Sequence, residues 1–432
     1  MRSSPEKPTV LLLVVDAVGV STLEGLFDRF PGPVALPNLA RLGLGPLLDP
    51  RHRGRVGPAQ GNAYAARLEQ ASASADSVIG HREMCGVIDA RTYSLFPEGF
   101  RADYIAALEE RIGRRTIFNR MAGGLEAIEL NAEEHERSGR PIVYASKCDP
   151  LIQIAMNESV ISVPEQHRIA DAAFALAGEM GIPVTRAIAR AYVRGADGEV
   201  VRTANRHDTV LPLEGRTLID ILRERRVWTA AVGKTSDLVN TAYHEKIKIT
   251  DPAFVDPALG LRFTHPKRKD TNPFTVQGIL NALACARAAY RPEGTFVFAN
   301  LVDTDSLYGH TRDVEGSLRC LAEFDRILPL FERALKPGDL LMITADHGML
   351  HGSDYGYHNN EPLPLLAERI GAGADLGGLV PGTGEGLTEV GALAAQVFGC
   401  AEEFRRAIVR IPAQKKAKGK KARPRPLGAR RA

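Results

Sequence analysis

Four segments of this chain share one pattern, a continuous apolar run with β-branched residues that ends abruptly in polar or turn residues. Three of the runs end in an aspartate, in TVLLLVVDAVGV, GTFVFANLVDTD and GDLLMITADHG, and the fourth, RRVWTAAVGK, ends in Gly233 and Lys234. Such runs are typical of strands buried on both faces of a parallel sheet. Helical patterns separate them, in LIDILRERR, NPFTVQGILNALACARAAY and VEGSLRCLAEFDRILPLFERAL. The alternation predicts an α/β fold with a mostly parallel sheet flanked by helices.

The middle of the chain follows a different pattern. Between about residues 100 and 215, short strand patterns (PIVYAS, AIARAYV, GEVVRTA) mix with helical patterns (ADYIAALEERI, EQHRIADAAFALAGEM), and RGADG supplies a hairpin turn. Long apolar strand patterns resume near Val227. We therefore predict one core made of residues 1–99 and 216–410, with an α+β cap domain inserted at residues 100–215.

The charge of the chain is unevenly distributed. The formal net charge is +3, but the last twenty residues hold nine Lys and Arg and no acid, which leaves 46 basic and 52 acidic residues, or −6, in the rest. A segment so rich in Lys, Gly, Pro and Ala cannot bury a core. We expect residues 411–432 to form a disordered basic tail, either a solubilising extension or a segment with weak, salt-sensitive affinity for RNA or another polyanion.

The remaining composition is that of a globular protein. Hydrophobic residues make up 44% of the chain, and no apolar stretch approaches the roughly 20 residues needed to span a bilayer. The N-terminal sequence shows no cleavable leader pattern. Five scattered cysteines without CxxC spacing argue against a disulfide framework and a Cys-type zinc site. These features predict a cytoplasmic protein with no membrane contact.

Acidic and imidazole side chains gather at the predicted strand ends, where α/β sheets bind their ligands. Three carboxylates and three imidazoles fall there: Asp16, Asp305, His310, Asp346, His347 and His358. The carboxylates would repel one another without a cation, and mixed Asp and His sets suit Mn²⁺ or Zn²⁺. A lone aspartate after a strand is more often a helix cap, but the combination favours a two-metal centre for phosphoryl transfer. Asp303 and His351 are interpreted as supporting or solvated residues.

The segment SASADSVIGHREMCGV supplies a candidate nucleophile. Ser77 lies among small residues and is followed by Gly80 and His81. A bound metal lowers the pKa of a hydroxyl and orients its oxygen for attack. Ser72 and Ser74 are alternative nucleophiles, and a Ser/Ala loop with helix caps is the purely structural interpretation.

The predicted cap carries a cluster of arginines in TRAIARAYVRGADGEVVRTANRHD. Guanidinium groups bind phosphate bidentately, although a solvated basic face would give the same pattern. The candidate phosphate contacts are Arg186, Arg190, Arg202, Arg206 and, at a strand end of the core, Lys234, whereas Arg194 is interpreted as solvated. Asp149, in YASKCDPLIQIA, can hydrogen-bond sugar hydroxyls, although an aspartate before a proline more commonly forms a turn.

These motifs resemble those of the phosphopentomutase family, in the alkaline phosphatase superfamily. The similar stretches run in order from residue 14 to about residue 366 and are VVDAVGV, LPNLARLGL, DSVIGHREMCG, SGRPIVYAS…DPLIQIA, RAIARAYV, RTANRHD, AVGKTSDL, NLVDTDSLYGHTRD, FDRILPLF and ITADHG…YHNNEPLPLL. RTANRHD is more specific to the family than ADHG, which the wider superfamily shares. The resemblance implies an alkaline-phosphatase-like core with an inserted cap and two Mn²⁺ ions.

The resemblance also implies roles for individual residues. One metal would be held by Asp305, His310 and His358, and the other by Asp16, Asp346 and His347. The residues on the family's substrate-contact motifs are Asp149, Arg190, Arg202, Arg206 and Lys234. The acceptor loop departs from the family's usual pattern, because Ser77 takes the place of a threonine and Arg82 that of a tryptophan. Arg82 is expected to place a cation near the acceptor and to affect the choice of substrate.

The expected activity is the interconversion of ribose or deoxyribose 1-phosphate and 5-phosphate through phosphorylated Ser77. The alternatives are a metal-dependent phosphatase or sulfatase, or a mutase of another phosphosugar, on the same fold. A polyanion-binding protein, suggested only by the basic tail, is a third hypothesis. Whether a sugar bisphosphate activates the enzyme stays open at the level of sequence.

Overall fold

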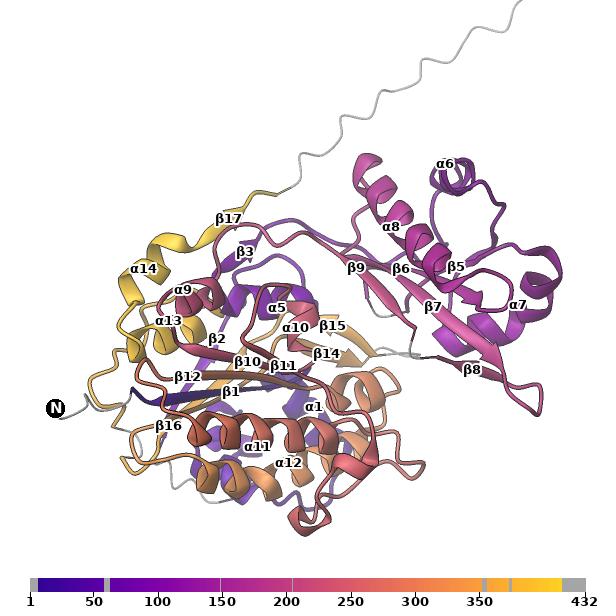
Figure 1. Ribbon diagram of the computed structural model, residues 1–432. Coiled ribbons are helices and arrows are strands. Elements are labelled where there is room, and N and C mark those ends of the chain that lie inside the picture. Colours follow the sequence, from indigo (N-terminus) through magenta and orange to yellow (C-terminus); the bar gives the residue numbers. More distant parts are fainter. Residues whose placement is uncertain are drawn as a thin grey trace, which may run out of the picture.

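The computed structural model describes residues 7–57, 63–147, 149–203, 205–351, 356–372 and 375–413. Within them, seven strands form the main sheet (Figure 1). Their spatial order is β11 (Glu245–Ile247), β10 (Trp228–Gly233), β12 (Thr295–Leu301), β1 (Thr9–Val15), β13 (Leu340–Thr344), β16 (Leu363–Arg369) and β2 (Tyr64–Leu68). The central parallel strands β10, β12, β1 and β13 are the four apolar runs of the sequence. Only β16 runs antiparallel to its described neighbours.

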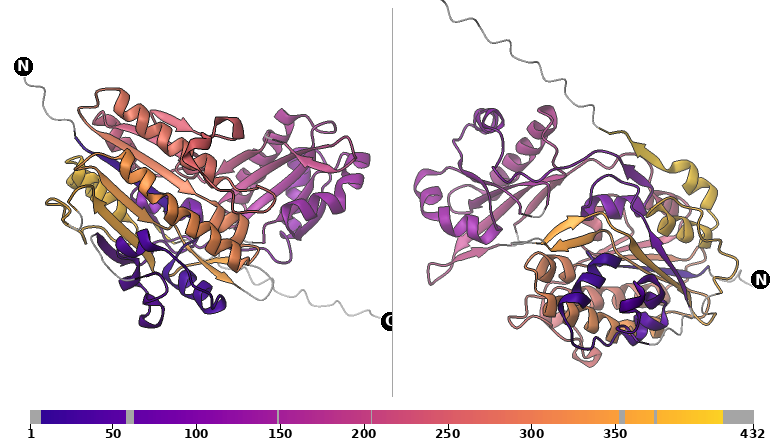
Figure 2. Two further views of the ribbon diagram at one scale, coloured as in Figure 1. Left: turned by 90° about the horizontal axis from the view of Figure 1, so that it is seen from below. Right: turned by 180° about the vertical axis from the view of Figure 1, so that it is seen from behind.

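The central strands are apolar along their length because helices cover both faces of the sheet. Helices α11 (Asn272–Ala288) and α12 (Val314–Ala334) lie on one face, and α5 (Ser77–Met84), α9 (Leu218–Glu224) and α13 (Thr388–Val397) lie on the other (Figures 1 and 2). Every residue of β12 and β13 is buried. The predicted α/β sheet is therefore confirmed, and one large hydrophobic cluster holds it together.

Shorter elements complete this part of the molecule. The helices are α1 (Val20–Arg29), α2 (Pro37–Arg41), α3 (Leu44–Leu47), α4 (Pro50–Arg53), α10 (Thr235–Leu238), α14 (Ala401–Ala407) and the single turns η1 (Pro252–Phe254), η2 (Pro257–Leu259) and η3 (Thr304–Gly309). Two small sheets pair β14 (Gly348–His351) with β15 (Gly356–Asn359) and β3 (Val87–Asp89) with β17 (Val409–Ile411).

A second sheet, which with its helices we call the cap, occupies residues 102–210. Its strands are β4 (Ile117–Met121), β5 (Ile142–Ala145), β6 (Leu151–Asn157), β7 (Arg186–Arg194), β8 (Val200–Arg202) and β9 (His207–Val210). Its helices are α6 (Ala102–Ile112), α7 (Gly124–Ser138) and α8 (Val163–Glu179). Strand β5 alternates strictly, since Ile142 and Tyr144 pack on the α7 side while Val143 and Ala145 pack on the α6 and α8 side.

Two chain segments join the cap to the core, one after β3 and one after β9, and they run close together. The guanidinium of Arg91 in the first segment lies 3.1 Å from the carboxylate of Glu214 in the second. These contacts place both connections at one side of the cap, as Figure 1 also shows. The boundaries at residues 100 and 215 stay a prediction.

The C-terminal region is described only as far as residue 413. Ile411 belongs to β17 and pairs with Asp89, so the segment predicted as a tail begins inside a strand. The basic residues of that tail lie outside the described part of the chain. No helix among the described residues is long and apolar enough to cross a bilayer.

Candidate active site

The acidic strand ends of the sequence meet at one edge of the main sheet. Strand β1 lies between β12 and β13 in parallel register, with Val15 opposite Leu301 and Val14 opposite Thr344. Asp16 follows β1, Asp305 lies in η3 after β12, and Asp346 follows β13. Asp16 is therefore a neighbour of two residues that follow it by about 300 positions in the sequence, at the carboxyl ends of adjacent strands.

Asp16, Asp346 and His347 form the first cluster, and all three are buried. The Nε2 atom of His347 lies 3.4 Å from Asp16 Oδ1 and 3.8 Å from Asp346 Oδ2. Asn300 donates a hydrogen bond to Asp16 Oδ2, and the backbone N–H of Ala17 donates one to Asp346 Oδ1. Asp16 Oδ1 and Asp346 Oδ2 are buried without a hydrogen-bond partner among the described residues.

The electrostatics of this cluster call for a cation. Burial, together with the charges of Asp346 and Asp305, raises the pKa of Asp16 well above its usual value. Burial alone would lower the pKa of His347, but Asp346 and Asp16 outweigh it and raise that pKa to about 9. A divalent ion between the carboxylates would take over the compensating role of that proton.

Asp305, His347 and His358 form a second cluster that shares His347 with the first. His358 Nε2 lies 3.2 Å and His310 Nε2 lies 3.1 Å from Asp305 Oδ1. The His347 and His358 rings stack with centroids 3.8 Å apart. Burial would raise the pKa of Asp305, but His310 and His358 lower it well below its usual value. The structure thus gathers all six predicted ligands, with His347 rather than His310 completing the second group.

Backbone carbonyls fix the tautomers of two of these histidines. The Nδ1–H of His347 donates to the carbonyl of Gly348, and the Nδ1–H of His310 donates to the carbonyl of Gly356, each over 3.0 Å. Both rings therefore direct Nε2 toward the carboxylates, and loss of the Nε2 proton would leave that nitrogen free to bind a metal. Unpaired buried oxygens and oriented imidazoles are the donor set of a divalent transition metal, so the residues fit such an ion.

Local backbone features hold the ligands in place. Ala17 adopts a left-handed conformation with φ of 60°, which is unusual for a residue with a side chain and turns its N–H toward Asp346. Asp305 lies in η3, a π-helical turn, a form that occurs mostly at functional sites. Gly80 of α5 lies so close to the Asp346 carbonyl that a Cβ atom there would approach its oxygen to 2.1 Å.

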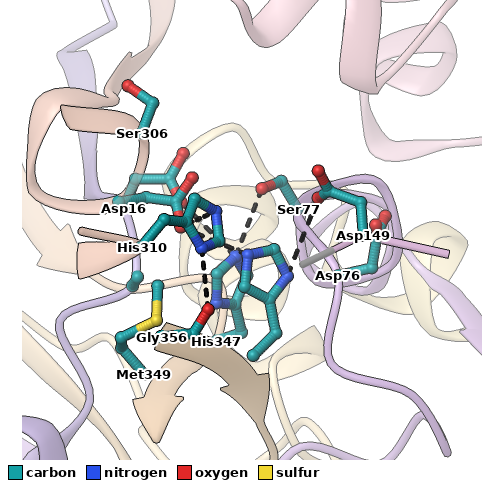
Figure 3. A network of polar contacts seen from close by, with 12 residues as sticks. Asp16, Asp76, Ser77, Asp149, Ser306, His310, His347, Met349 and Gly356 are labelled. Atoms are coloured by element: carbon teal, nitrogen blue, oxygen red, sulfur yellow. Dashed lines mark hydrogen bonds and ion pairs between the residues drawn. The ribbon is translucent and has the colours of Figure 1, made fainter. Parts of the chain in front are cut away.

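Ser77 is the first residue of α5 and lies against the metal-ligand clusters. Its Oγ is 3.2 Å from His347 Nε2, and Figure 3 shows the hydroxyl turned toward that ring. Asp76 caps the helix by accepting a hydrogen bond from the N–H of Val78. Ser72 and Ser74, the alternatives from the sequence, instead accept hydrogen bonds from backbone N–H groups of residues 89 and 93.

A cavity of about 1020 Å³, open to solvent, separates this edge of the core from the cap. Its core wall includes Ser77, Asp305, His310 and Lys234. Its cap wall includes the predicted substrate contacts Asp149, Arg186, Arg190, Arg202 and Arg206. The predicted nucleophile and the predicted phosphate contacts thus face the same cavity from opposite sides.

The cap wall is strongly basic. Burial and the neighbouring charge of Arg206 lower the pKa of Arg190 to about 10, and its Nε donates to Gln153 at 2.9 Å. Arg186 and Asp149 form an ion pair of 3.3 Å, and Arg206 pairs with Asp208. A buried guanidinium whose pKa is lowered by neighbouring arginines would be stabilised by an anion such as phosphate.

Other residues singled out in the sequence lie away from the cavity. Asp303 accepts hydrogen bonds from Thr271 and Asn272, so it orients the loop before α11. Arg194 pairs with Glu136 on an exposed surface. His351 lies in β14, and its side chain is outside the described part of the structure. Arg82 lies on the acceptor helix as expected, but its guanidinium donates to backbone carbonyls and does not line the cavity. Its effect on the choice of substrate stays a prediction.

Sequence reasoning missed three supporting residues. His81 Nδ1 lies 2.8 Å from the carbonyl oxygen of Ser77 and 3.3 Å from Asp346 Oδ2. Asn300 holds Asp16, and Gln153 holds Arg190. Both amides interrupt otherwise apolar strands, in TFVFANL and LIQIAMN, and a polar residue inside a buried strand is the signal that would have identified them.

Comparison with known proteins connects this site to a family. Residues 217–401, which contain five of the six predicted metal ligands, match the model of the Metalloenzyme superfamily. The phosphopentomutase of Carboxydothermus hydrogenoformans is 34% identical over 410 residues, covering 90% of this chain and 95% of the relative. The chain belongs to the phosphopentomutase family. The phosphopentomutase of Thermotoga petrophila is also 34% identical, over 90% of this chain and 95% of its own.

Membership of the phosphopentomutase family confirms several predictions. The protein is a phosphomutase, an enzyme of the isomerase class, and it uses divalent metal. The sheet order described above also confirms the predicted α/β core with a mostly parallel sheet flanked by helices. Among solved structures, a phosphoglycerate mutase of Leishmania mexicana aligns with 92% of this chain and 96% of its own, at 11% identity and a TM-score of 0.44.

Proposed function

We propose that the protein interconverts the 1-phosphate and the 5-phosphate of ribose or deoxyribose through phosphorylated Ser77. One observation carries the proposal. The Ser77 hydroxyl, beside two clusters of metal-ligating side chains, and the cap arginines face one cavity from opposite walls. A substrate with a reacting group at one end and an anion at the other fits that arrangement, and a phosphorylated pentose is such a molecule.

In this proposal two Mn²⁺ ions bind at the sheet edge, one to Asp16, Asp346 and His347 and the other to Asp305, His310 and His358. His347 lies within reach of both groups. The metal pair would lower the pKa of the Ser77 hydroxyl and neutralise charge on the transferring phosphoryl group. The mixed carboxylate and imidazole donors suit Mn²⁺, and other divalent metals are alternatives.

The protein's own groups bind and orient the substrate. Arg190, Arg202, Arg206 and Lys234 would hold the phosphate that is not reacting, and Asp149 would accept hydrogen bonds from sugar hydroxyls. Because Arg190 and Arg202 are fixed on strands β7 and β8 and Arg206 directly precedes β9, the reacting end of the sugar would be directed toward Ser77. Closing of the cap over a bound substrate would limit the access of water to the phosphorylated serine.

In this proposal the phosphoryl transfer takes place in two steps. Phosphorylated Ser77 gives its phosphoryl group to the free sugar hydroxyl, whose proton ends on Ser77 Oγ, and a sugar bisphosphate results. The bisphosphate then turns over in the cavity and returns its other phosphoryl group to Ser77, with the proton passing back to the sugar oxygen. A sugar bisphosphate added from outside would load Ser77 at the start and act as the activator.

A second candidate is hydrolysis of a phosphate or sulfate ester at the same site, or turnover of another phosphosugar. The openness of the cavity to solvent and the serine at the acceptor position favour it. In that case water, rather than a sugar hydroxyl, would take the phosphoryl group from Ser77.

Incubation of the enzyme with Mn²⁺ and ribose 5-phosphate distinguishes the proposed mutase activity from the second candidate. The proposal predicts ribose 1-phosphate as the main product with little free phosphate. Release of free phosphate in place of ribose 1-phosphate would support hydrolysis, and turnover of hexose phosphates at higher kcat/KM would point to another sugar.

A further inference from the structure

Arg82 connects the acceptor helix to the cap. It lies on α5, five positions after Ser77, and only 4% of its surface is exposed. Its guanidinium donates three hydrogen bonds to backbone carbonyls, to Leu211 at 2.7 Å and to Pro212 and Leu238 at 3.1 Å each. None of these acceptors belongs to α5 or to its neighbours in sequence, so the side chain bridges distant segments.

Two of the three acceptors belong to the chain segment that returns from the cap. Leu211 and Pro212 directly follow β9, the strand that pairs with β7. The N–H of Leu211 donates to the carbonyl of Thr185, and Thr185 precedes Arg186, the first residue of β7. A displacement of this segment would therefore move the strand that carries Arg186 and Arg190.

The third acceptor belongs to the loop that carries Lys234. Leu238 is the last residue of α10, which begins directly after Lys234, and Leu238 also lines the cavity. The side chain of Arg82 thus links the helix with the acceptor to two other segments, the connection to the cap arginines and the loop with the core lysine.

The chemistry of the contact favours a fixed geometry. All three acceptors are neutral carbonyls, and burial lowers the pKa of Arg82 to about 10. A buried guanidinium is tolerated only when its donors are satisfied. Its planar fork presents five N–H groups in fixed directions, whereas a tryptophan at this position would offer a single N–H.

We propose that Arg82 is a positioning residue that sets the cap arginines at a fixed distance from Ser77 and thereby directs the phosphoryl group to a sugar hydroxyl rather than to water. The inference rests on the proposed mutase activity. Without the Arg82 guanidinium, the segment that contains Leu211 and Pro212 and the loop that contains Lys234 lose a shared hydrogen-bond donor. The cap then takes a range of positions in which water reaches phosphorylated Ser77.

The test compares Arg82→Met and Arg82→Lys with Arg55→Met. Arg55 is a matched control, because its guanidinium also donates to three backbone carbonyls, those of Phe27, Phe30 and Gly32, but all three belong to α1 or to the core segment directly after it. For each variant we would measure ribose 1-phosphate and free phosphate from ribose 5-phosphate, bound Mn²⁺, and hydrogen exchange of peptides covering residues 207–216 and 234–241.

For Arg82→Met we expect mutase kcat/KM to fall about tenfold or more, in line with loss of hydrogen bonds from a charged donor. The free phosphate formed per ribose 1-phosphate should rise, exchange in both peptides should quicken, and bound Mn²⁺ should not change. Arg82→Lys keeps the charge but not the planar guanidinium. Its ratio of free phosphate to ribose 1-phosphate should lie between those of the wild type and Arg82→Met. Arg55→Met should leave the ratio and both peptides unchanged.

The inference is overturned if Arg82→Met and Arg82→Lys keep the wild-type product ratio and the wild-type exchange of both peptides. It is also overturned if Arg55→Met shifts the product ratio as far as Arg82→Met does. A wild-type enzyme that forms no ribose 1-phosphate would contradict the proposed function instead. The exchange measurement would then still decide whether Arg82 anchors the two segments.

Discussion

At the scale of single residues, the site combines buried groups that are unfavourable by themselves. Asp16 holds a carboxylate oxygen without a partner among the described residues, and the cap arginines crowd together opposite it. In the proposed function, the carboxylates would bind a cation and the arginines would bind a phosphate. Buried carboxylate oxygens without a partner and crowded like charges are more typical of a binding site than of a structural ion-pair network.

Replacing Asp16 with asparagine tests the cation side. Burial and the nearby carboxylates raise the pKa of Asp16, so at neutral pH its ionised form is unfavourable without metal. We expect Asp16→Asn to unfold at a higher Tm than the wild type in a chelator, and to lose most of the increase in Tm that Mn²⁺ gives the wild type. Calorimetry with and without Mn²⁺ measures both. A variant that still responds fully to Mn²⁺ would exclude Asp16 as a ligand.

Replacing Arg190 with methionine tests the phosphate side. Hydrogen bonds to a charged group contribute about 1.5–3 kcal/mol, so we expect KM for ribose 5-phosphate to rise about tenfold or more. Arg194→Met is the control, because Arg194 lies on the same strand but is exposed and pairs with Glu136. Equal effects of the two substitutions on KM would show that Arg190 does not bind substrate.

At the scale of secondary-structure elements, the position of α5 depends on the absence of one side chain. Gly80 lies against the Asp346 carbonyl, and a Cβ atom would come within 2.1 Å of its oxygen. We expect Gly80→Ala to push α5 away from the ligands and to lower Mn²⁺ affinity and kcat together. Gly25→Ala in α1 is the matched control, because its Cβ would meet no atom within 4 Å.

The Gly25→Ala control should have a free energy of unfolding about 0.5–1 kcal/mol higher than that of the wild type, because alanine has a higher helix propensity than glycine. Titration of Mn²⁺ by calorimetry, with turnover measured on the same samples, compares the two variants. Wild-type Mn²⁺ affinity in Gly80→Ala would mean that α5 does not position the ligands.

The cap contains a histidine that must be neutral. His135 of α7 donates from Nδ1 to the carbonyl of Arg140 at 2.7 Å, and its Nε2 accepts from the N–H of Asn157 in β6 at 2.9 Å. Burial lowers its pKa below the ordinary value of 6.5. The unfolded chain therefore binds a proton more readily than the folded cap does once the pH falls below 6.5.

We expect the stability that neutral His135 provides to be complete above pH 6.5 and to decline as the pH falls toward the lower pKa of the folded protein. Urea unfolding between pH 7.5 and 5.5, followed by hydrogen exchange of α7 and β6, measures this loss. His135→Gln, which cannot take up a proton, should show a smaller loss over the same range. The same loss in both proteins would assign the acid sensitivity to other groups.

Local patterns predicted some elements and missed others for physical reasons. The strands β1, β10, β12 and β13 were predicted because both of their faces are buried, so every residue is apolar. Helix α7 was missed because it buries few side chains and is polar elsewhere. Strand β16 contains Pro364, which weakens a strand pattern, yet it pairs on both sides within the sheet.

The candidate site was predictable in composition but not in arrangement. Aspartates at strand ends meet at one edge for any parallel sheet, so the six ligand candidates follow from pattern alone. The sharing of His347 between both clusters depends on how two loops pack. The direction of Arg82 depends on contacts with residues 211, 212 and 238, which no local pattern specifies.

At the scale of the whole molecule, the two sheets carry different parts of the candidate site. The main sheet gathers the metal ligands and Ser77, and the cap presents arginines across the cavity. A phosphatase needs only the first part, whereas a mutase must also hold an intermediate that carries two phosphates. In the proposed mechanism, the basic cap wall would hold the second phosphate and so favour transfer between two positions of one sugar.

The most direct test of this account is the location of phosphate on the protein during turnover. Enzyme loaded with Mn²⁺ and a pentose bisphosphate should carry one phosphate, on the peptide that contains Ser77, and a chase with ribose 5-phosphate should remove it. Ser77→Ala should bind Mn²⁺ yet carry no phosphate and lose mutase turnover. Phosphate found on Ser72 or Ser74, or full turnover by Ser77→Ala, would contradict the account.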